Sequence, residues 1–210
     1  MAKALVFDFD GTLVDSIGSI WEEYQRVMEA MNLKRVTHRE FTRHIGRAWA
    51  DVITSLWPGV DPKEFTSHYR LEAEVVKPID GADMALEKLA EKYVLAIMSA
   101  RGGETLNPHL RRMGYNLELF KAVYHRNNLK YNKPDPRAIL QVCKRLKVKP
   151  GDVIYIGDSI VDAECALKAG AGFIAVLSGG AYPEDFREMG VTDIIGSVAE
   201  LPSHLEERGH

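Results

Sequence analysis

The sequence predicts an α/β protein, with a doubly wound parallel sheet and an inserted all-α helical cap subdomain. Three observations predict this fold. Short apolar runs of strand length recur along the chain, helical patterns separate the later runs, and residues 15–78 contain several helix starts but no comparable strand. Strands that alternate with helices are typical of an open parallel sheet with helices on both faces.

Five apolar runs are the expected strands of the sheet. Most of them lack strict alternation of apolar and polar residues, which indicates strands buried on both faces. The runs are 4–9, 93–98, 122–124, 153–156 and 173–177. The helices expected between the later strands cover 82–91, 105–113, 136–146 and 161–169.

The long segment between the first two strands needs a fold of its own. Because a compact domain rarely contains a structureless connection of this length, we expect residues 15–78 to form a helical subdomain. The segments 37–40 and 61–64 both have the spacing of a capping box, which marks the start of a helix. Residues 1–14 and 79–210 then form the α/β core.

All three tryptophans, Trp21, Trp49 and Trp57, fall in the predicted insert. Large aromatic side chains usually fill hydrophobic cores, so one interpretation is that they pack the insert itself. The alternative is a wall that faces a substrate.

The net charge of −3 conceals a basic block in the middle of the chain. Residues 101–150 contain 12 Lys and Arg but only 3 Asp and Glu. A single-stranded nucleic acid would need aromatic residues interleaved with these charges, and the helix expected at 136–146 has none. We therefore expect a solvated helix face rather than a nucleic-acid site. The outward residues are then Arg137, Lys144, Arg145 and Lys147, and the inward residues are Ile139, Leu140, Cys143 and Leu146.

Two cysteines, Cys143 and Cys165, are too few for a disulfide framework or a cysteine zinc site built from this chain alone. The apolar run at the N-terminus is short and is interrupted by Asp8, unlike a signal peptide. No apolar stretch approaches the roughly 18 residues of a membrane span. We expect a cytoplasmic protein with no membrane partner.

The first expected strand ends in a pair of aspartates. Asp8 and Asp10 are two residues apart, so on a strand both side chains point the same way. Gly11 follows them and allows the backbone to turn sharply and a ligand to come close. Ligands of open α/β sheets bind beyond the carboxyl ends of the strands. Both aspartates are therefore candidates for a functional site.

A second acidic motif, Gly157-Asp158-Ser159-Ile160-Val161-Asp162, follows another expected strand. If Asp158 and Asp162 approach the first pair, their like charges repel one another. A divalent cation removes this conflict, and carboxylate oxygens suit Mg²⁺ better than zinc. Each carboxylate could instead cap a helix or a turn, an alternative that weighs most for Asp162.

Two further polar residues stand near the ends of expected elements. Ser99 comes directly after the run at 93–98, and Lys133 stands before Pro134, which fixes the entry to the next helix. A hydroxyl, neighbouring backbone N–H groups and an ammonium together neutralise the oxygens of a phosphoryl group. Alone, either residue would be typical of a turn or of the surface.

These motifs, in this order, resemble those of the haloacid dehalogenase superfamily of phosphohydrolases. The resemblance covers nearly the whole chain. Its motifs are Asp8-x-Asp10-Gly11-Thr12, Ser99, Lys133 before Pro134, and Gly157-Asp158-Ser159-x-x-Asp162. The insert between the first and second motifs is similar to the helical cap of the subclass that contains phosphoglycolate phosphatases and β-phosphoglucomutases.

The resemblance implies a role for each motif. Asp8 would be the nucleophile that forms an aspartyl-phosphate, and Asp10 the acid and base of the two half-reactions. Mg²⁺ would be held by Asp8, the backbone carbonyl of Asp10, and Asp158, with Asp162 in support. The phosphate would be bound by Gly11, Ser99, Lys133 and the backbone N–H of Ala100. Within the superfamily, a carboxylate at the position of Asp10 favours a phosphate ester over a haloacid.

Substrate choice is expected to come from the cap, which closes over the site. Arg47 follows a glycine turn and is a candidate for pairing with a substrate carboxylate or a second phosphate, with a solvated surface position as the alternative. His44 and Trp49 are further candidates. Arg101, the residue after Ala100, either reaches the substrate or belongs to the basic face.

Together these features predict a Mg²⁺-dependent phosphatase that hydrolyses a small phosphorylated metabolite, similar to phosphoglycolate or a sugar phosphate. A phosphosugar mutase or phosphotransferase would use the same site and is the nearest alternative. A non-catalytic binding module is a third alternative, but no catalytic carboxylate is missing to support it.

Overall fold

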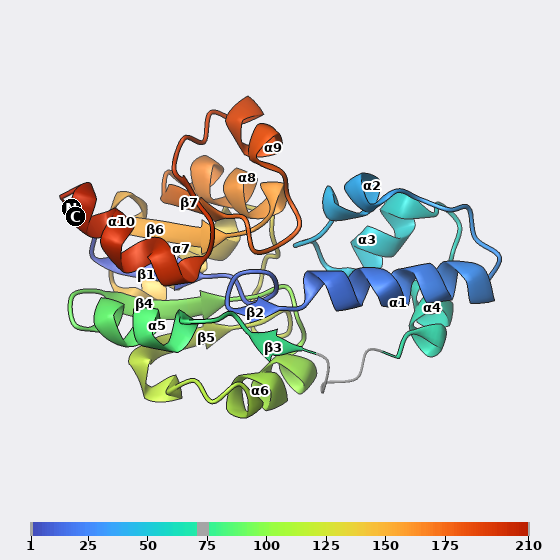
Figure 1. Ribbon diagram of the computed structural model, residues 1–210, viewed down its shortest axis with the longest axis horizontal. Helices are drawn as coiled ribbons and strands as arrows, with labels where there is room; N and C mark the ends of the chain where they lie inside the picture. The colour runs from blue at the N-terminus through green and yellow to red at the C-terminus, as the bar shows by residue number, and fades with distance from the viewer. Residues whose placement is uncertain (1, 71–75, 210) are drawn as a thin grey trace.

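The computed structural model describes residues 2–70 and 76–209. Figure 1 shows a sheet covered by helices and a group of helices that projects from one end of it. The chain leaves the sheet through β2 (Val14–Asp15) and returns through β3 (Lys77–Pro78), and these strands pair with each other in antiparallel fashion. The projecting helices are therefore an insertion in an α/β core.

A six-stranded parallel sheet forms the core. Its strands lie in the order β5-β4-β1-β6-β7-β8. Their bounds are β1 Ala4–Phe7, β4 Val94–Met98, β5 Phe120–Tyr124, β6 Val153–Gly157, β7 Gly172–Val176 and β8 Ile194–Ile195. β1 is central, with Leu5 opposite Leu95 of β4 on one side and opposite Ile154 of β6 on the other. The strand order reverses at β1, which is where ligands bind in sheets of this kind.

Helices cover both faces of the sheet, so the doubly wound fold is confirmed. They are α5 Ala82–Ala90, α6 Gly103–Arg112, α7 Arg137–Leu146, α8 Ile160–Ala169, α9 Pro183–Glu188 and α10 Leu201–Glu207. Leu5 and Phe7 pack with α5, α6 and α10 on one face, whereas Ala4 and Val6 pack with α7, α8 and α9 on the other. Within the described residues, none of the helices is long and apolar enough to cross a membrane.

The inserted part has an apolar core of its own. Its helices are α1 Ile17–Ala30, α2 His38–Thr42, α3 Trp49–Leu56 and α4 Pro62–His68. Tyr24, Phe41 and Phe65 are buried between them, together with Trp57. Trp21 packs against this cluster from outside. We refer to residues 17–70, which contain these four helices and the two residues after α4, as the insert.

Two helices of the insert start at the capping segments that the sequence predicts. Thr37 and Glu40 form a complete capping box at α2, in which each side chain bonds the backbone N–H of the other residue. Asp61 caps α4 differently, because its side chain accepts a hydrogen bond from the backbone N–H of Lys63. Pro62 occupies the first turn, where its missing N–H leaves no hydrogen bond unmade.

A polar contact holds the insert against the core. Arg39 of α2 forms an ion pair with Asp185 of α9, with Nη2 3.0 Å from Oδ1. The same guanidinium lies over the ring of Tyr182, 5.2 Å from its centroid. This contact fixes one side of the space between the two parts.

The sequence patterns do not predict several of the shortest helices and strands. The two-residue strands β2, β3 and β8 and the helices α9 and α10 were not predicted. The first strand ends at Phe7 rather than at residue 9, because the chain turns at once through Gly11, whose backbone N–H bonds the carbonyl of Val14.

One inward residue of α7 is wrongly predicted. Leu140 is 41% exposed, whereas Ala138, Ile139, Val142 and Cys143 form the buried stripe. At 3.6 residues per turn these four side chains share one face, and Leu140 falls outside it. The predicted outward residues of α7 and its end, Arg137, Lys144, Arg145 and Lys147, are exposed.

Adjacent residues of α7 offer a matched test of this packing. Ile139→Ala leaves a cavity beside the sheet and should lower the free energy of unfolding by about 2–5 kcal/mol. Leu140→Ala removes an exposed side chain and should change it by about 0.5 kcal/mol or less. Urea denaturation followed by circular dichroism measures both, and equal losses in the two variants would contradict the assigned helix face.

Candidate active site

The candidate site lies at the carboxyl edge of the sheet. Asp8 follows β1, Ser99 follows β4 and Asp158 follows β6, and these three strands are neighbours. Lys133 joins them from the segment between β5 and α7. All four side chains are buried. The sheet thus brings together residues that lie far apart in the sequence.

Lys133 is the cation at the centre of the site. Its Nζ lies 3.0 Å from Asp8 Oδ2 and 2.6 Å from Asp162 Oδ1, and it donates a 3.3 Å hydrogen bond to the hydroxyl of Tyr155. Burial alone would lower the pKa of Lys133, but the two carboxylates raise that pKa above its ordinary value. The ammonium therefore stays charged and offsets part of the negative charge around it.

The carboxylates around Lys133 remain under electrostatic stress. Burial, together with Asp162 and Asp10, raises the pKa of Asp8 to about 7 against the opposing effect of Lys133. Burial, with Asp162 and Asp8, raises the pKa of Asp158 well above its usual value. One lysine does not compensate this many buried acidic groups, so the ionised cluster calls for a further positive charge.

A divalent metal ion fits these residues. Single carboxylate oxygens of Asp8, Asp158 and Asp162 lie within 4.8 Å of one another. Asp8 Oδ1 is buried with no hydrogen-bond partner, an atom that a metal would satisfy. Both oxygens of Asp162 already accept hydrogen bonds, from Lys133 and from Ser159. Asp158 also accepts two hydrogen bonds, but the one to its Oδ1, from Thr12, is 3.5 Å long, whereas both bonds to Asp162 are 2.6 Å. Asp8 and Asp158 are therefore the better direct ligands, with Asp162 in support.

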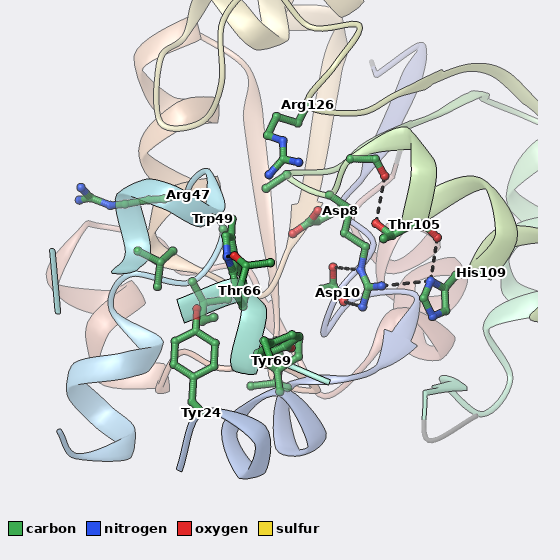
Figure 2. A pocket seen from close by; sticks show the side chains of 18 of the residues that line it. Asp8, Asp10, Tyr24, Arg47, Trp49, Thr66, Tyr69, Thr105, His109 and Arg126 are labelled. Atoms are coloured by element: carbon green, nitrogen blue, oxygen red, sulfur yellow. Dashed lines mark hydrogen bonds and ion pairs between the residues drawn. The ribbon is translucent and has the colours of Figure 1, made fainter. Parts of the chain in front are cut away.

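Asp10 does not join this cluster, because Arg101 holds it. Arg101 Nε and Nη2 each lie 2.7 Å from one oxygen of the Asp10 carboxylate, and Ser16 Oγ donates a further 2.6 Å hydrogen bond. Burial would raise the pKa of Asp10, but Arg101 and Ser16 lower it below its ordinary value. Figure 2 shows this pair continuing to His109 through the other nitrogen of the guanidinium.

Arg101 therefore turns into the site and does not belong to the basic face. It is only 14% exposed and lies over the ring of Phe9, 5.5 Å from the ring centroid. Its backbone N–H donates to Ser99 Oγ at 3.1 Å. Of the two alternatives for this residue, the structure excludes the basic face and places the guanidinium on Asp10.

Gly11 is required by a close approach of backbone to carboxylate. Its φ of +69° lies in the left-handed region, and a Cβ there would collide with Asp158 Oδ2. Gly180 contributes from the other side, where its backbone N–H donates to the same oxygen at 3.0 Å. Thr12 is also buried beside Asp158. The backbone thus encloses Asp158 closely.

A cavity of about 320 Å³ opens above these groups, between the core and the insert. Asp8, Asp10 and Ala100 line it on the core side, and Trp49 lines it on the insert side. Arg47 also belongs to the lining, but its guanidinium points away from Asp8 in Figure 2. The other sequence-predicted residues are not among the lining residues described. These are Gly11, His44, Ser99, Lys133 and Asp158.

Several lining residues were missed by the sequence analysis. Tyr24 and Tyr69 come from the insert, and Thr105 and His109 from α6. Arg126 lies two residues beyond the end of β5, so its place at the carboxyl edge of the sheet was a usable signal. The other four carry no such signal, because helix packing alone turns them towards the cavity.

The site contains buried carboxylates at the ends of central parallel strands, with a buried lysine among them and a helical insert above. These features define a hydrolytic or phosphoryl-transfer enzyme with an α/β core. The sequence family described as haloacid dehalogenase-like hydrolase matches residues 5–176. The chain belongs to this family, so the resemblance that the motifs suggest is confirmed.

Relatives and solved structures agree with this assignment. The chain is 28% identical over 193 residues to the N-acetylmuramic acid 6-phosphate phosphatase of Pseudomonas aeruginosa, covering 87% of this chain and 85% of the relative. It is 23% identical over 220 residues to the phosphoglycolate phosphatase of Psychrobacter arcticus, covering 97% and 95%. The crystal structure of a hydrolase from Pseudomonas syringae has the same fold, with a TM-score of 0.86, 24% identity and 98% of each chain covered.

The central lysine yields a stability prediction. Lys133→Met leaves Asp8 and Asp162 buried without their cation, so the free energy of unfolding in EDTA should fall by about 3–5 kcal/mol. Urea denaturation at neutral pH provides the measurement.

Two further variants control this experiment. Adding Asp162→Asn to Lys133→Met removes one of the stranded charges and should recover part of the lost stability. Lys168→Met breaks only an exposed pair with Glu164, and should change the free energy of unfolding by less than about 1 kcal/mol. A loss at Lys133 no larger than that at Lys168 would contradict the role assigned to this ammonium.

Proposed function

We propose that this enzyme hydrolyses a small phosphomonoester through an aspartyl-phosphate, with Mg²⁺ as its metal. The observation that carries the proposal is Asp8, which lines the cavity at the end of β1 with one oxygen beside Lys133 and the other without a partner. The names of the two relatives, both phosphatases, support the same class of reaction.

The first half-reaction follows from the placement of the two aspartates. A carboxylate oxygen of Asp8 attacks phosphorus and the bond from phosphorus to the ester oxygen breaks. Asp10, once it has exchanged its bonds with Arg101 and taken up a proton from solvent, gives that proton to the departing alcohol. In the second half-reaction Asp10 takes a proton from water, whose oxygen attacks the same phosphorus. Inorganic phosphate leaves, and Asp8 is regenerated as a carboxylate.

Asp10 must exchange hydrogen bonds to perform these steps. Arg101 occupies both of its oxygens and Ser16 a further lone pair, so the ester oxygen needs one of these positions. Because the guanidinium is adjacent, it can then donate to a phosphate oxygen instead. The proposed reaction therefore includes a rearrangement of the pair formed by Asp10 and Arg101.

The remaining groups bind and orient the phosphate. The ammonium of Lys133, the hydroxyl of Ser99 and the backbone N–H of Ala100 would each offer a donor to a phosphoryl oxygen, whereas the backbone N–H of Gly11 is bonded to the carbonyl of Val14. Mg²⁺ would be held by Asp8, Asp158 and the carbonyl of Asp10. Once bound, it would shield the nucleophile from the charge of the phosphate and stabilise the charge on the transferring group.

The same proposal includes the setting in which the enzyme works. Cys143 and Cys165 are both free thiols, which supports the cytoplasmic location that the sequence predicts. The exposed basic side chains of α7 support a solvated face rather than a nucleic-acid site. The proposed partner is therefore a small phosphorylated metabolite.

Metal binding is testable without turnover. Mg²⁺ at a hundredfold excess over its Kd should raise the melting temperature of the metal-free protein by roughly 5–10 °C, because it binds only the folded state. Asp158→Asn should abolish this gain, and Asp152→Asn, at a surface pair with Lys3, should keep it. Differential scanning fluorimetry with Mg²⁺ and with EDTA makes the comparison. An undiminished gain in Asp158→Asn would contradict the proposed metal site.

Turnover of p-nitrophenyl phosphate tests the chemistry itself. Release of p-nitrophenol should require Mg²⁺ and stop in EDTA. Asp8→Asn removes the nucleophile with little change of shape and should lower kcat at least about a thousandfold. Asp83→Asn, on the exposed surface of α5, is the matched control and should keep full activity. Equal rates in the two variants would refute the role of Asp8.

A further inference from the structure

The cavity above Asp8 is larger than a phosphate group requires. Its volume of about 320 Å³ equals that of about ten water molecules at roughly 30 Å³ each. Pockets for organic ligands start at about 300 Å³. The cavity therefore has room for the group to which the phosphate is attached.

The insert gives this cavity an apolar wall. It contributes aliphatic and aromatic side chains, among them Ile17, Ile20, Tyr24, Trp49, Val52 and Tyr69. Figure 2 shows Trp49 and Tyr69 on the side of the cavity across from Asp8 and Asp10. A substrate whose phosphate meets Asp8 would thus direct its organic group towards these rings.

The ring of Trp49 is held in a fixed orientation. Its Nε1 donates a 2.8 Å hydrogen bond to Thr66 Oγ1, which itself donates to the carbonyl of Pro62 at 2.6 Å. The ring of Tyr69 meets it edge-on, with centroids 4.6 Å apart, and Tyr24 does so at 5.4 Å. Because the only donor of the indole is used, Trp49 offers the cavity an apolar and preorganised surface.

Two of the three arginines in the lining are already engaged. Arg101 pairs with Asp10, and Arg126 Nη2 lies 3.3 Å from Glu104 Oε1. The two arginines on the core side are thus engaged, whereas Arg47 turns away from Asp8 and its buried Nε has no hydrogen-bond partner.

The wall also suits an aromatic ring better than a sugar. The hydroxyl of Thr66 accepts a hydrogen bond from Trp49 and donates one to the carbonyl of Pro62, so it has no donor left for a ligand. Hydroxyl groups of a sugar placed against the indole of Trp49 would lose their hydrogen bonds to water and gain none from the indole, which weakens binding. A flat apolar ring has no such cost and gains contact with Trp49.

Building on the proposed function, we propose that the substrate is a phosphomonoester of an aromatic alcohol, whose ring stacks on Trp49. The core supplies the groups that act on phosphate, and Trp49 determines which alcohol is accepted. The flanking Tyr69 and Tyr24 keep the indole in place.

Two esters with matched chemistry test the preference. Benzyl phosphate and ethyl phosphate are both esters of primary alcohols, so they differ chiefly in the ring. With Mg²⁺, kcat/KM for benzyl phosphate should exceed that for ethyl phosphate at least about tenfold. It should also exceed the values for phosphoglycolate and glucose 6-phosphate. A ratio near one, or a higher value for either of these two, would overturn the proposal.

Variants assign the preference to one side chain. Trp49→Leu should bring the benzyl-to-ethyl ratio of kcat/KM close to one, and Trp49→Phe should retain most of the ratio. Trp21→Leu is the matched control, since Trp21 also lies in the insert but packs on Phe41 outside the cavity lining. A ratio unchanged in Trp49→Leu would overturn the assignment. The ratio in the parent enzyme tests the proposal even if this variant fails to fold.

Binding of inert analogues separates this inference from the proposed hydrolysis. Benzylphosphonate and ethylphosphonate have a carbon–phosphorus bond in place of the ester, and calorimetry with Mg²⁺ measures their affinities. A Kd at least about tenfold lower for benzylphosphonate supports the ring site even if no ester is hydrolysed, which would refute only the proposed function. Efficient hydrolysis with equal affinities would refute only the ring site.

Discussion

The structure depends on how the mutual repulsion of carboxylates at the carboxyl edge of its sheet is compensated. Asp8, Asp158 and Asp162 are all buried, and a single ammonium, Lys133, lies among them. Burial removes the water that would screen these charges, so the arrangement is stable only where other groups compensate it. Lys133 gives part of this compensation, and the partnerless oxygen of Asp8 indicates that a bound cation would complete it.

The fold meets this constraint with rigid backbone on every side. Parallel strands end at a common edge, so β1 and β6 deliver Asp8 and Asp158 to adjacent positions. Gly11 lies so close to the carboxylate of Asp158 that a Cβ at this position would collide with it, and the backbone N–H of Gly180 donates to the carboxylate from the opposite side. The acidic cluster is therefore held by the sheet and its turns, and Gly46 of the insert lies close to Ser159, which bonds Asp162.

The sequence predicts this charged centre well because its residues stand at strand ends. Strand patterns locate Asp8, Ser99 and Asp158, and parallel order then places them at one edge. The partner of Asp10 was harder to predict from the sequence. Arg101 reaches it only because β4 lies beside β1 and because the guanidinium turns inward rather than to solvent, a choice that residue type leaves open.

Helix packing limits prediction in the same way. Leu140 was assigned to the buried side of α7 because it is apolar, but the buried stripe runs through its neighbours and leaves it outside. The aromatic wall of the cavity depends on how the four helices of the insert meet, which no single segment encodes. Trp49, at the start of α3, contacts Tyr69, which follows α4 and lies twenty residues later in the sequence, and Tyr24 of α1 contacts both rings.

Asp10 links the two parts of the molecule. It accepts one hydrogen bond from Ser16, at the start of α1, and two from Arg101 of the core. The core thus positions the charged groups, and the insert shapes the cavity that Asp10 lines.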